Sequence, residues 1–143
     1  MRLRAFLVLL EVLFCCLCAA ADQTAACPAT VNVQQQLAAR VAGWSSMLDD
    51  APHQLAGITL YDGPPQDKAS LAYDDITKAA GKQVAKWSFT LHSERPIWIA
   101  CSYSGTSVVL MKALPATVSG CVVTYDARQQ IAGLPAIEKI AGK

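Results

Sequence analysis

The chain has 143 residues and a formal net charge of +1 at neutral pH, with twelve basic and eleven acidic residues. This length suffices for one domain with its own core. Charges of both signs are interspersed without long runs, which excludes nucleic acid as a partner because phosphate recognition needs a basic face.

The N-terminus predicts a secretory signal peptide over residues 1–21. Arg2 and Arg4 supply a positive start, and the apolar stretch Ala5–Leu17 has the length of a signal core. Small residues then lead up to Ala21, which places the cut after that residue or one residue earlier. The remainder, residues 22–143, is expected to form a single β-rich domain with ten charges of each sign, located in the periplasm or secreted.

Two other readings of the N-terminus are weaker. An uncleaved membrane anchor would have to tolerate Glu11 near its middle, and the apolar run is short for a bilayer span. Thr24–Cys27 resembles the end of a lipid-attachment box, but Thr is a poor leading residue there. No stable membrane span is expected once the signal is removed.

Three cysteines remain after the signal is removed, and they predict one disulfide. We expect Cys101 to pair with Cys121, because each lies in a strand-like run and the exported chain enters an oxidising compartment. A closed loop of about 20 residues would contribute roughly 3 kcal/mol in the loop-entropy model. This pairing needs neighbouring or curled strands, so Cys27 remains an alternative partner for either cysteine.

Beyond the signal, hydrophobic residues alternate with a period of two. The clearest case is Gln83–Leu91, where Ala85, Trp87 and Phe89 share one face. Residues 104–106 form a hairpin turn. The expected strands are Thr30–Gln36, Leu55–Tyr61, Gln83–Leu91, Ile97–Tyr103, Ser107–Lys112 and Gly120–Asp126.

Helical patterns are sparse. Pro65 starts a short predicted helix that runs to Leu71, and Pro135 starts a turn or two with Ile137 and Ile140 on one side. Residues 37–48 have helix-forming residues interrupted by Gly43, so they read as either helix or irregular chain. The fold class is therefore mainly β (β-rich α+β), with about six mostly antiparallel strands in a curled sheet or partial barrel and one or two short helices.

Residues for catalysis or metal binding are few. The two histidines, His53 and His92, have no metal-ligand spacing, and the chain lacks the Gly-x-Ser-x-Gly elbow of serine hydrolases. We predict no catalytic residue, no metal and no cofactor. The alternative is a periplasmic hydrolase that uses His53 with nearby carboxylates such as Asp49, Asp50 and Asp62.

A rigid loop follows the second predicted strand. In Asp62-Gly63-Pro64-Pro65, glycine permits a positive φ and the prolines cannot continue a ladder, so the motif ends the strand. The same stiffness would let the loop bind a partner at low entropic cost. Trp98 lies on the face opposite Cys101 and is either a cover for a second layer or an exposed anchor. The candidate interface residues are Tyr61, Asp62, Gly63, Pro64, Pro65 and Trp98.

Several of these motifs together resemble a known family. They are Cys27-Pro28, Asp50–Leu55, Tyr61–Pro65, Trp98–Tyr103 and Cys121–Asp126. In this combination the chain resembles a family of small exported proteobacterial proteins of unknown function, named after a hypothetical protein of typhoid Salmonella. The resemblance implies a periplasmic setting in a Gram-negative cell and carries over no catalytic residues.

These observations favour a non-enzymatic exported protein that acts by binding. A signal peptide, a small disulfide-supported sheet and no recognisable reacting group suit an inhibitor or immunity-type domain. The expected partner is another protein.

Overall fold

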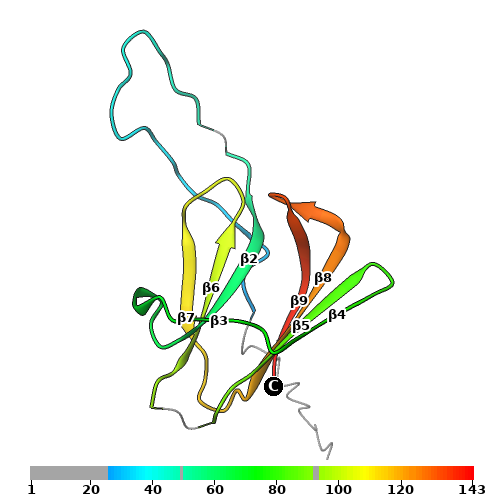
Figure 1. The fold of residues 1–143 in the computed structure, drawn as a ribbon. Helices are drawn as coiled ribbons and strands as arrows, with labels where there is room; N and C mark the ends of the chain where they lie inside the picture. The colour runs from blue at the N-terminus through cyan, green and yellow to red at the C-terminus, as the bar shows by residue number, and fades with distance from the viewer. Residues whose placement is uncertain (1–25, 49, 92–93) are drawn as a thin grey trace, which may run out of the picture.

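The computed structural model describes residues 26–48, 50–91 and 94–143, and they form two antiparallel sheets (Figure 1). The predicted signal peptide, Asp49 and His92 lie outside the described residues. Within the part that is described, no helix has the length and hydrophobicity needed to span a membrane.

The first sheet carries most of the candidate residues. Its strands follow the order β1-β2-β6-β7, and β3 pairs with part of β2. The strands are β1 (Thr30–Val31), β2 (His53–Asp62), β3 (Ser70–Leu71), β6 (Ile97–Tyr103) and β7 (Val109–Ala113).

The second sheet is built from two hairpins in the order β4-β5-β8-β9. Its strands are β4 (Asp75–Ala79), β5 (Lys82–Ser88), β8 (Gly120–Ile131) and β9 (Leu134–Gly142). Each hairpin closes through a two-residue turn, Ala80-Gly81 and Ala132-Gly133, in which both residues have φ between 50° and 79°. Positive φ at both positions is the type I′ geometry, whose twist matches that of the flanking strands.

The core lies between the two sheets. Leu60 and Ile99 from the first sheet and Cys121 and Val123 from the second are fully buried. They meet because alternate residues of a strand face the same side, so each sheet turns one apolar face inward. The other face of the first sheet is left for other contacts.

The prediction of a mainly β, antiparallel fold is confirmed, with curled sheets that do not close into a barrel. Four of the predicted strands correspond closely to β2, β5, β6 and β7, and a fifth to the first half of β8. The expected strand Thr30–Gln36 is wrong beyond Val31, since β1 has only two residues. The chain leaves the sheet there and enters a long irregular loop.

The helix expected from Pro135 is wrong, because this segment is strand β9. Ile137 and Ile140 both pack against the core, although they are three residues apart. The reason is a bulge: Ile137 pairs with Tyr125 while Lys139 pairs with Thr124, so Glu138 is an extra residue. A bulge shifts the alternation by one and imitates a helical spacing.

The helix expected after Pro65 is present only as the short 3₁₀ turn η1 (Pro65–Asp67). It ends at Asp67 and is capped by Lys68, whose φ is 57°, and the chain then forms β3. The pairing of Leu71 with Leu60 draws this segment back onto the sheet, which prevents a longer helix.

The predicted Cys101–Cys121 disulfide is also wrong. Cys101 is bonded to Cys27, with a Cα–Cα distance of 5.9 Å, and Cys121 is free and buried. Cys101 and Cys121 belong to different sheets, whereas the segment before β1 reaches β6, where the Tyr103 hydroxyl donates a hydrogen bond to Pro28 O at 3.1 Å. The bond links residues 74 positions apart, which the chain-entropy model values at about 4 kcal/mol.

Candidate interaction surface

The Asp62–Pro65 loop is held in place by Arg95. The Arg95 guanidinium donates hydrogen bonds to Asp62 O at 2.7 Å and to Asp67 Oδ2 at 2.8 Å. It lies directly over Gly63, which is buried with φ of 86°, so a side chain at position 63 would collide with it. The loop is therefore rigid, and Pro64 is its exposed residue.

Tyr61 and Trp98 lie beside each other on the outer face of the first sheet. They are directly paired between β2 and β6, and Ala113 of β7 is the next residue across. Both aromatic side chains are half-buried. The indole Nε1 of Trp98 is buried and has no hydrogen-bond partner among residues 26–48, 50–91 and 94–143.

The outer face continues from Trp98 onto β7. Met111 pairs with Ala100, and Val109 pairs with Ser102, so both side chains point outward beside small neighbours. Met111 and Val109 are 46% and 45% exposed. Tyr61, Trp98, Met111 and Val109 thus form an apolar strip along this face, which we call the outer strip.

Strand β7 is exposed in a further way, because all five of its residues are exposed and one of its edges is unpaired in the described sheet. Leu114 N–H donates to Ile97 O, so by alternation Lys112 and Leu110 turn their backbone groups toward β6. The backbone groups of Val109, Met111 and Ala113 therefore face outward. An apolar, unprotected edge of this kind is a template for pairing with another strand.

The edge strand β4 of the second sheet differs from β7. β4 begins with Asp75, which forms an ion pair with Lys86, and carries Lys78 farther along. Charged side chains of this kind protect an edge against pairing with other chains. β7 has a charge only at Lys112, so it is the less protected of these two edges.

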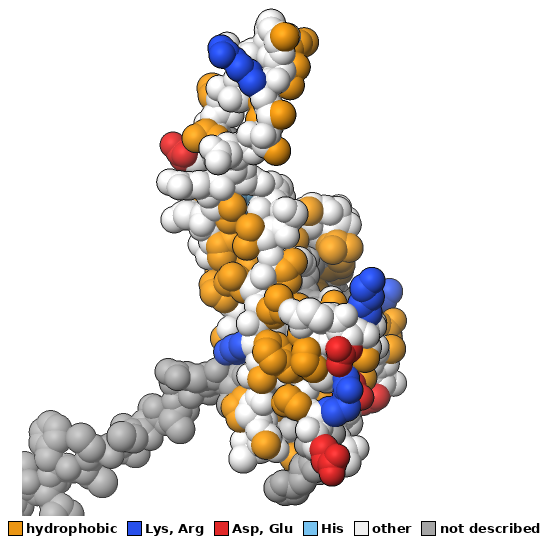
Figure 2. Space-filling view, turned by 90° about the vertical axis from the view of Figure 1, so that its left-hand side faces the viewer, with side chains coloured by type: hydrophobic (Ala, Val, Ile, Leu, Met, Phe, Trp, Pro, Cys, Tyr) orange, Lys and Arg blue, Asp and Glu red, His pale blue; other side chains and the backbone are white. Residues whose placement is uncertain are grey.

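A long loop rises from the same end of the sheet as the turn between β6 and β7 (Figure 1). It spans residues 32–52, between β1 and β2. Figure 2 shows hydrophobic side chains on this protrusion and others below it along the body of the molecule. The exposed large apolar residues of the loop are Leu37, Val41, Trp44, Met47 and Leu48.

The base of this loop surrounds His53, the residue that the hydrolase alternative requires. His53 Nδ1 is 2.7 Å from Ser104 O, and its Nε2 is 3.5 Å from the amide nitrogen of Gln35. Asp50 lines the same cleft of about 560 Å³, and Asp62 lies at the other end of β2. Within the described ranges, the hydrogen-bond partners of His53 are thus a backbone carbonyl and a neutral amide rather than a carboxylate.

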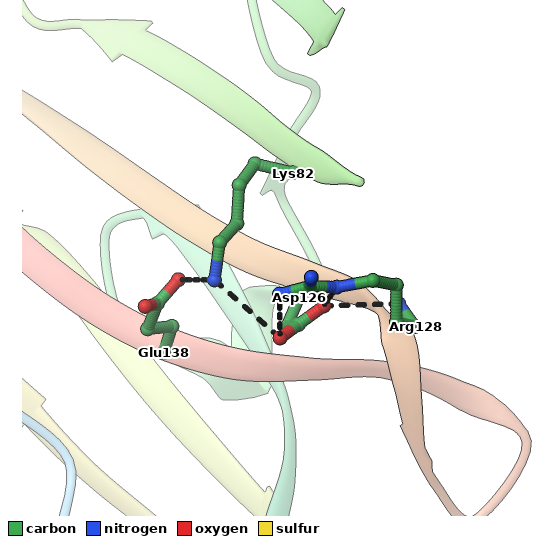
Figure 3. A network of polar contacts seen from close by, with 4 residues as sticks. All are labelled: Lys82, Asp126, Arg128 and Glu138. Carbon is green, nitrogen blue, oxygen red and sulfur yellow. Dashed lines mark hydrogen bonds and ion pairs between the residues drawn. The ribbon is translucent and has the colours of Figure 1, made fainter. Parts of the chain in front are cut away.

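A cluster of four charged side chains lies on the second sheet and crosses three strands (Figure 3). Arg128 donates to both Asp126 oxygens at 3.1 Å, and Lys82 Nζ lies 3.4 Å from Asp126 and 2.6 Å from Glu138. The hydrogen bonds from Arg128 hold the pKa of the Asp126 carboxyl well below its usual range. A carboxylate fixed in this way binds strands together and is a poor proton acceptor.

No group of three or more metal-ligating side chains occurs in the described part of the chain. The candidate residues therefore sort by position: Tyr61 and Trp98 join the outer strip, whereas Asp62 and Gly63 are held by Arg95. β7 and the long loop were not among the predicted sites. A continuous apolar run such as Val108–Met111 reads as a buried strand, and only the topology reveals it as an exposed edge.

A comparison with known protein families finds one match. The model of the Type VI secretion system Tli immunity protein family matches residues 50–138, which is more than half of the chain. The chain belongs to this family. The prediction of an immunity-type domain is thereby confirmed. No curated protein and no solved structure matches the chain.

The match to the Tli immunity family covers almost all of both sheets, from the start of β2 into β9. The outer strip and the edge of β7 belong to this matched part. The long loop precedes the match, apart from its last residues.

Proposed function

We propose that this Tli immunity protein is exported to the periplasm and neutralises a toxin of a type VI secretion system by binding it, without catalysing a reaction. The membership of the immunity family carries this proposal. The signal-like N-terminus supports the periplasmic location, because residues 1–17 combine a basic start with an apolar core.

The outer strip and the free edge of β7 are the proposed toxin-binding surface. Aromatic and methionine side chains are enriched at protein interfaces, and tryptophan and tyrosine are among the residues that contribute most to binding energy. Met111 contributes both an exposed side chain and outward backbone groups, so it lies where side-chain packing and strand pairing coincide. The rigid Asp62–Pro65 loop borders the strip beside Tyr61, and Pro64 adds an exposed, preordered contact.

The contacts of His53 favour binding over hydrolysis. A catalytic histidine is normally oriented by a carboxylate and placed beside a nucleophile. His53 instead joins the root of the long loop to the turn after β6 through Ser104 O. Its position supports a structural role at the loop base.

The test is a binding measurement with the purified mature chain and the purified product of the gene adjacent to its own. Replacing Met111→Ser together with Val109→Lys should weaken binding by 10-fold or more, since both residues are exposed and the lysine blocks the edge. Pro64→Ala with Pro65→Ala should weaken binding less. Leu91→Ser, at an exposed apolar residue outside the strip, is the matched control and should bind like the wild type.

Thermal unfolding of each variant shows whether the fold is retained. If wild type binds and the β7 variant binds equally well, the toxin contacts a different surface. If the folded wild type neither binds nor protects against the neighbouring gene product, the immunity proposal fails for that pair.

A further inference from the structure

The long loop of residues 32–52 is unusual in a domain of this size. It contains no strand or helix in its described residues, and connections longer than about 12–15 residues without such structure are uncommon in compact domains. It extends away from both sheets (Figure 1). Nothing in the packing of the two sheets requires it.

The loop has an apolar surface, and no other described part of the chain covers it. Met47 is 93% exposed and Trp44 is 77% exposed, and Leu37, Val41 and Leu48 are all at least half exposed. Figure 2 shows hydrophobic side chains along this protrusion. Exposed apolar clusters of this kind mark sites of contact with another molecule.

The base of the loop is attached to the first sheet, whereas its tip projects away from it. The Cys27–Cys101 disulfide and the hydrogen bond from Leu55 N–H to Ala29 O hold the N-terminal side against the sheet. Within the loop itself, Gln35 Nε2 donates a hydrogen bond of 3.2 Å to Gly105 O. These attachments fix the direction in which the loop projects, which lowers the ordering cost of inserting it into a partner.

The tip is shaped as a turn. Trp44 N–H donates to Val41 O at 3.2 Å, and Gly43 between them has φ of 80°. No atom outside the turn would touch a Cβ at position 43, so the turn is open to solvent on that side. Trp44 therefore stands beside a narrow, protruding turn.

The side chains of the loop indicate which kind of partner binds it. Between residues 33 and 48 the only charged side chain is that of Arg40. Attachment to a membrane surface usually relies on several basic residues, so a single arginine favours an apolar protein cleft over lipid. Trp44 and Met47 lie before residue 50, where the family match begins, so any contact they make is additional to those of the matched part.

We infer that the loop is a finger that inserts Trp44 and Met47 into an apolar cleft of the toxin. This inference rests on the proposed function and adds a second contact to the outer strip. The loop projects from the end of the sheet where β7 begins, so its base lies near Val109, the residue of the outer strip at that end.

The experiment compares three forms of the mature chain for binding to the purified product of the adjacent gene. Trp44→Ser with Met47→Ser should weaken binding about 30-fold or more, because an interface tryptophan commonly contributes at least 2 kcal/mol. Leu91→Ser serves as the control. Both altered loop residues are exposed, so the thermal midpoint should stay unchanged.

A second measurement locates the finger directly. Benzoylphenylalanine in place of Met47 should cross-link to the toxin on irradiation, while the same group in place of Leu91 should not. Sedimentation with vesicles that contain anionic lipid tests the membrane, and the wild type should stay in the supernatant.

Wild-type binding that the loop variant retains in full would overturn the finger while leaving the immunity function intact. Vesicle binding that disappears in the loop variant would assign the finger to lipid instead. Cross-linking of Met47 only to a second copy of the chain would assign it to self-association.

Discussion

Cys121 shows how burial controls the chemistry of a single residue. Its side chain is fully buried between the sheets, and desolvation raises the pKa of the thiol to about 11. The thiol is therefore protonated at neutral pH and shielded from reagents. Because the folded-state pKa lies above the ordinary value of 9.0, the stability gained from the neutral thiol decreases as the pH rises through that range toward 11.

This gives the first prediction, on the cysteines of the mature chain. Alkylation of the native protein at pH 8 should label none of the three cysteines appreciably. Unfolding without reduction should expose Cys121 alone, and peptide mapping should join Cys27 to Cys101. A peptide that links Cys101 to Cys121 would contradict the structure.

Asp126 gives the second prediction, on acid stability. Its pKa is lowered by hydrogen bonds from Arg128, so its contribution is present above the unfolded pKa of about 3.9 and is lost as the pH falls through the folded pKa. Asp126→Asn should destabilise the protein at pH 7, and the difference from wild type should shrink below about pH 4. Denaturant unfolding over pH 2–7 measures this. A difference that is constant with pH would rule out the ionised carboxylate as the cause.

The elements of the fold differ in how far the sequence predicts them. β6 is predicted correctly because Ile97, Ile99 and Cys101 alternate with residues of the other face and a turn follows Tyr103. β9 is missed because the bulge at Glu138 gives its two isoleucines a helical spacing. Local patterns record which residues are apolar, but a bulge is fixed by the partner strand.

The same limit applies to the candidate site. Local patterns mark Trp98 and Tyr61 as candidates, and the pairing of β2 with β6 places them side by side. The exposure of Met111 depends on β7 being at the edge of its sheet, which follows from long-range pairing. The sequence does not give the disulfide pairing for the same reason, since only the arrangement of the two sheets separates Cys121 from Cys101.

The two hairpin turns give the third prediction. Ala80 and Ala132 both have φ of 50°, a region that costs residues other than glycine and asparagine about 1–2 kcal/mol. Ala132→Asn should raise the thermal midpoint by about 2–5 °C, and Ala80→Asn should act similarly. Ala116→Asn, at an exposed position without positive φ, is the control. Equal effects at positions 116 and 132 would show that turn geometry is not the source.

At the scale of the molecule, the two sheets support surfaces that take no part in the packing of the core. The core residues come from the inward faces, while the outer strip, the β7 edge and the long loop remain exposed. In a member of an immunity family, this separation of a buried core from exposed apolar surfaces suits a protein that acts by binding another protein. The ion pairs and the disulfide of the described residues stabilise the fold, whereas the proposed activity depends on the shape and the apolar surface of the molecule.

The most direct test of this account is a survival assay in cells that export the toxin encoded by the adjacent gene to their periplasm. We predict that the full-length chain with its signal restores growth, and that the same chain without residues 1–21 does not. The Trp44→Ser/Met47→Ser and Val109→Lys/Met111→Ser variants, exported at wild-type levels, should protect poorly, while Leu91→Ser protects fully. Growth that fails to recover with the exported wild-type protein at such levels would contradict the central claim.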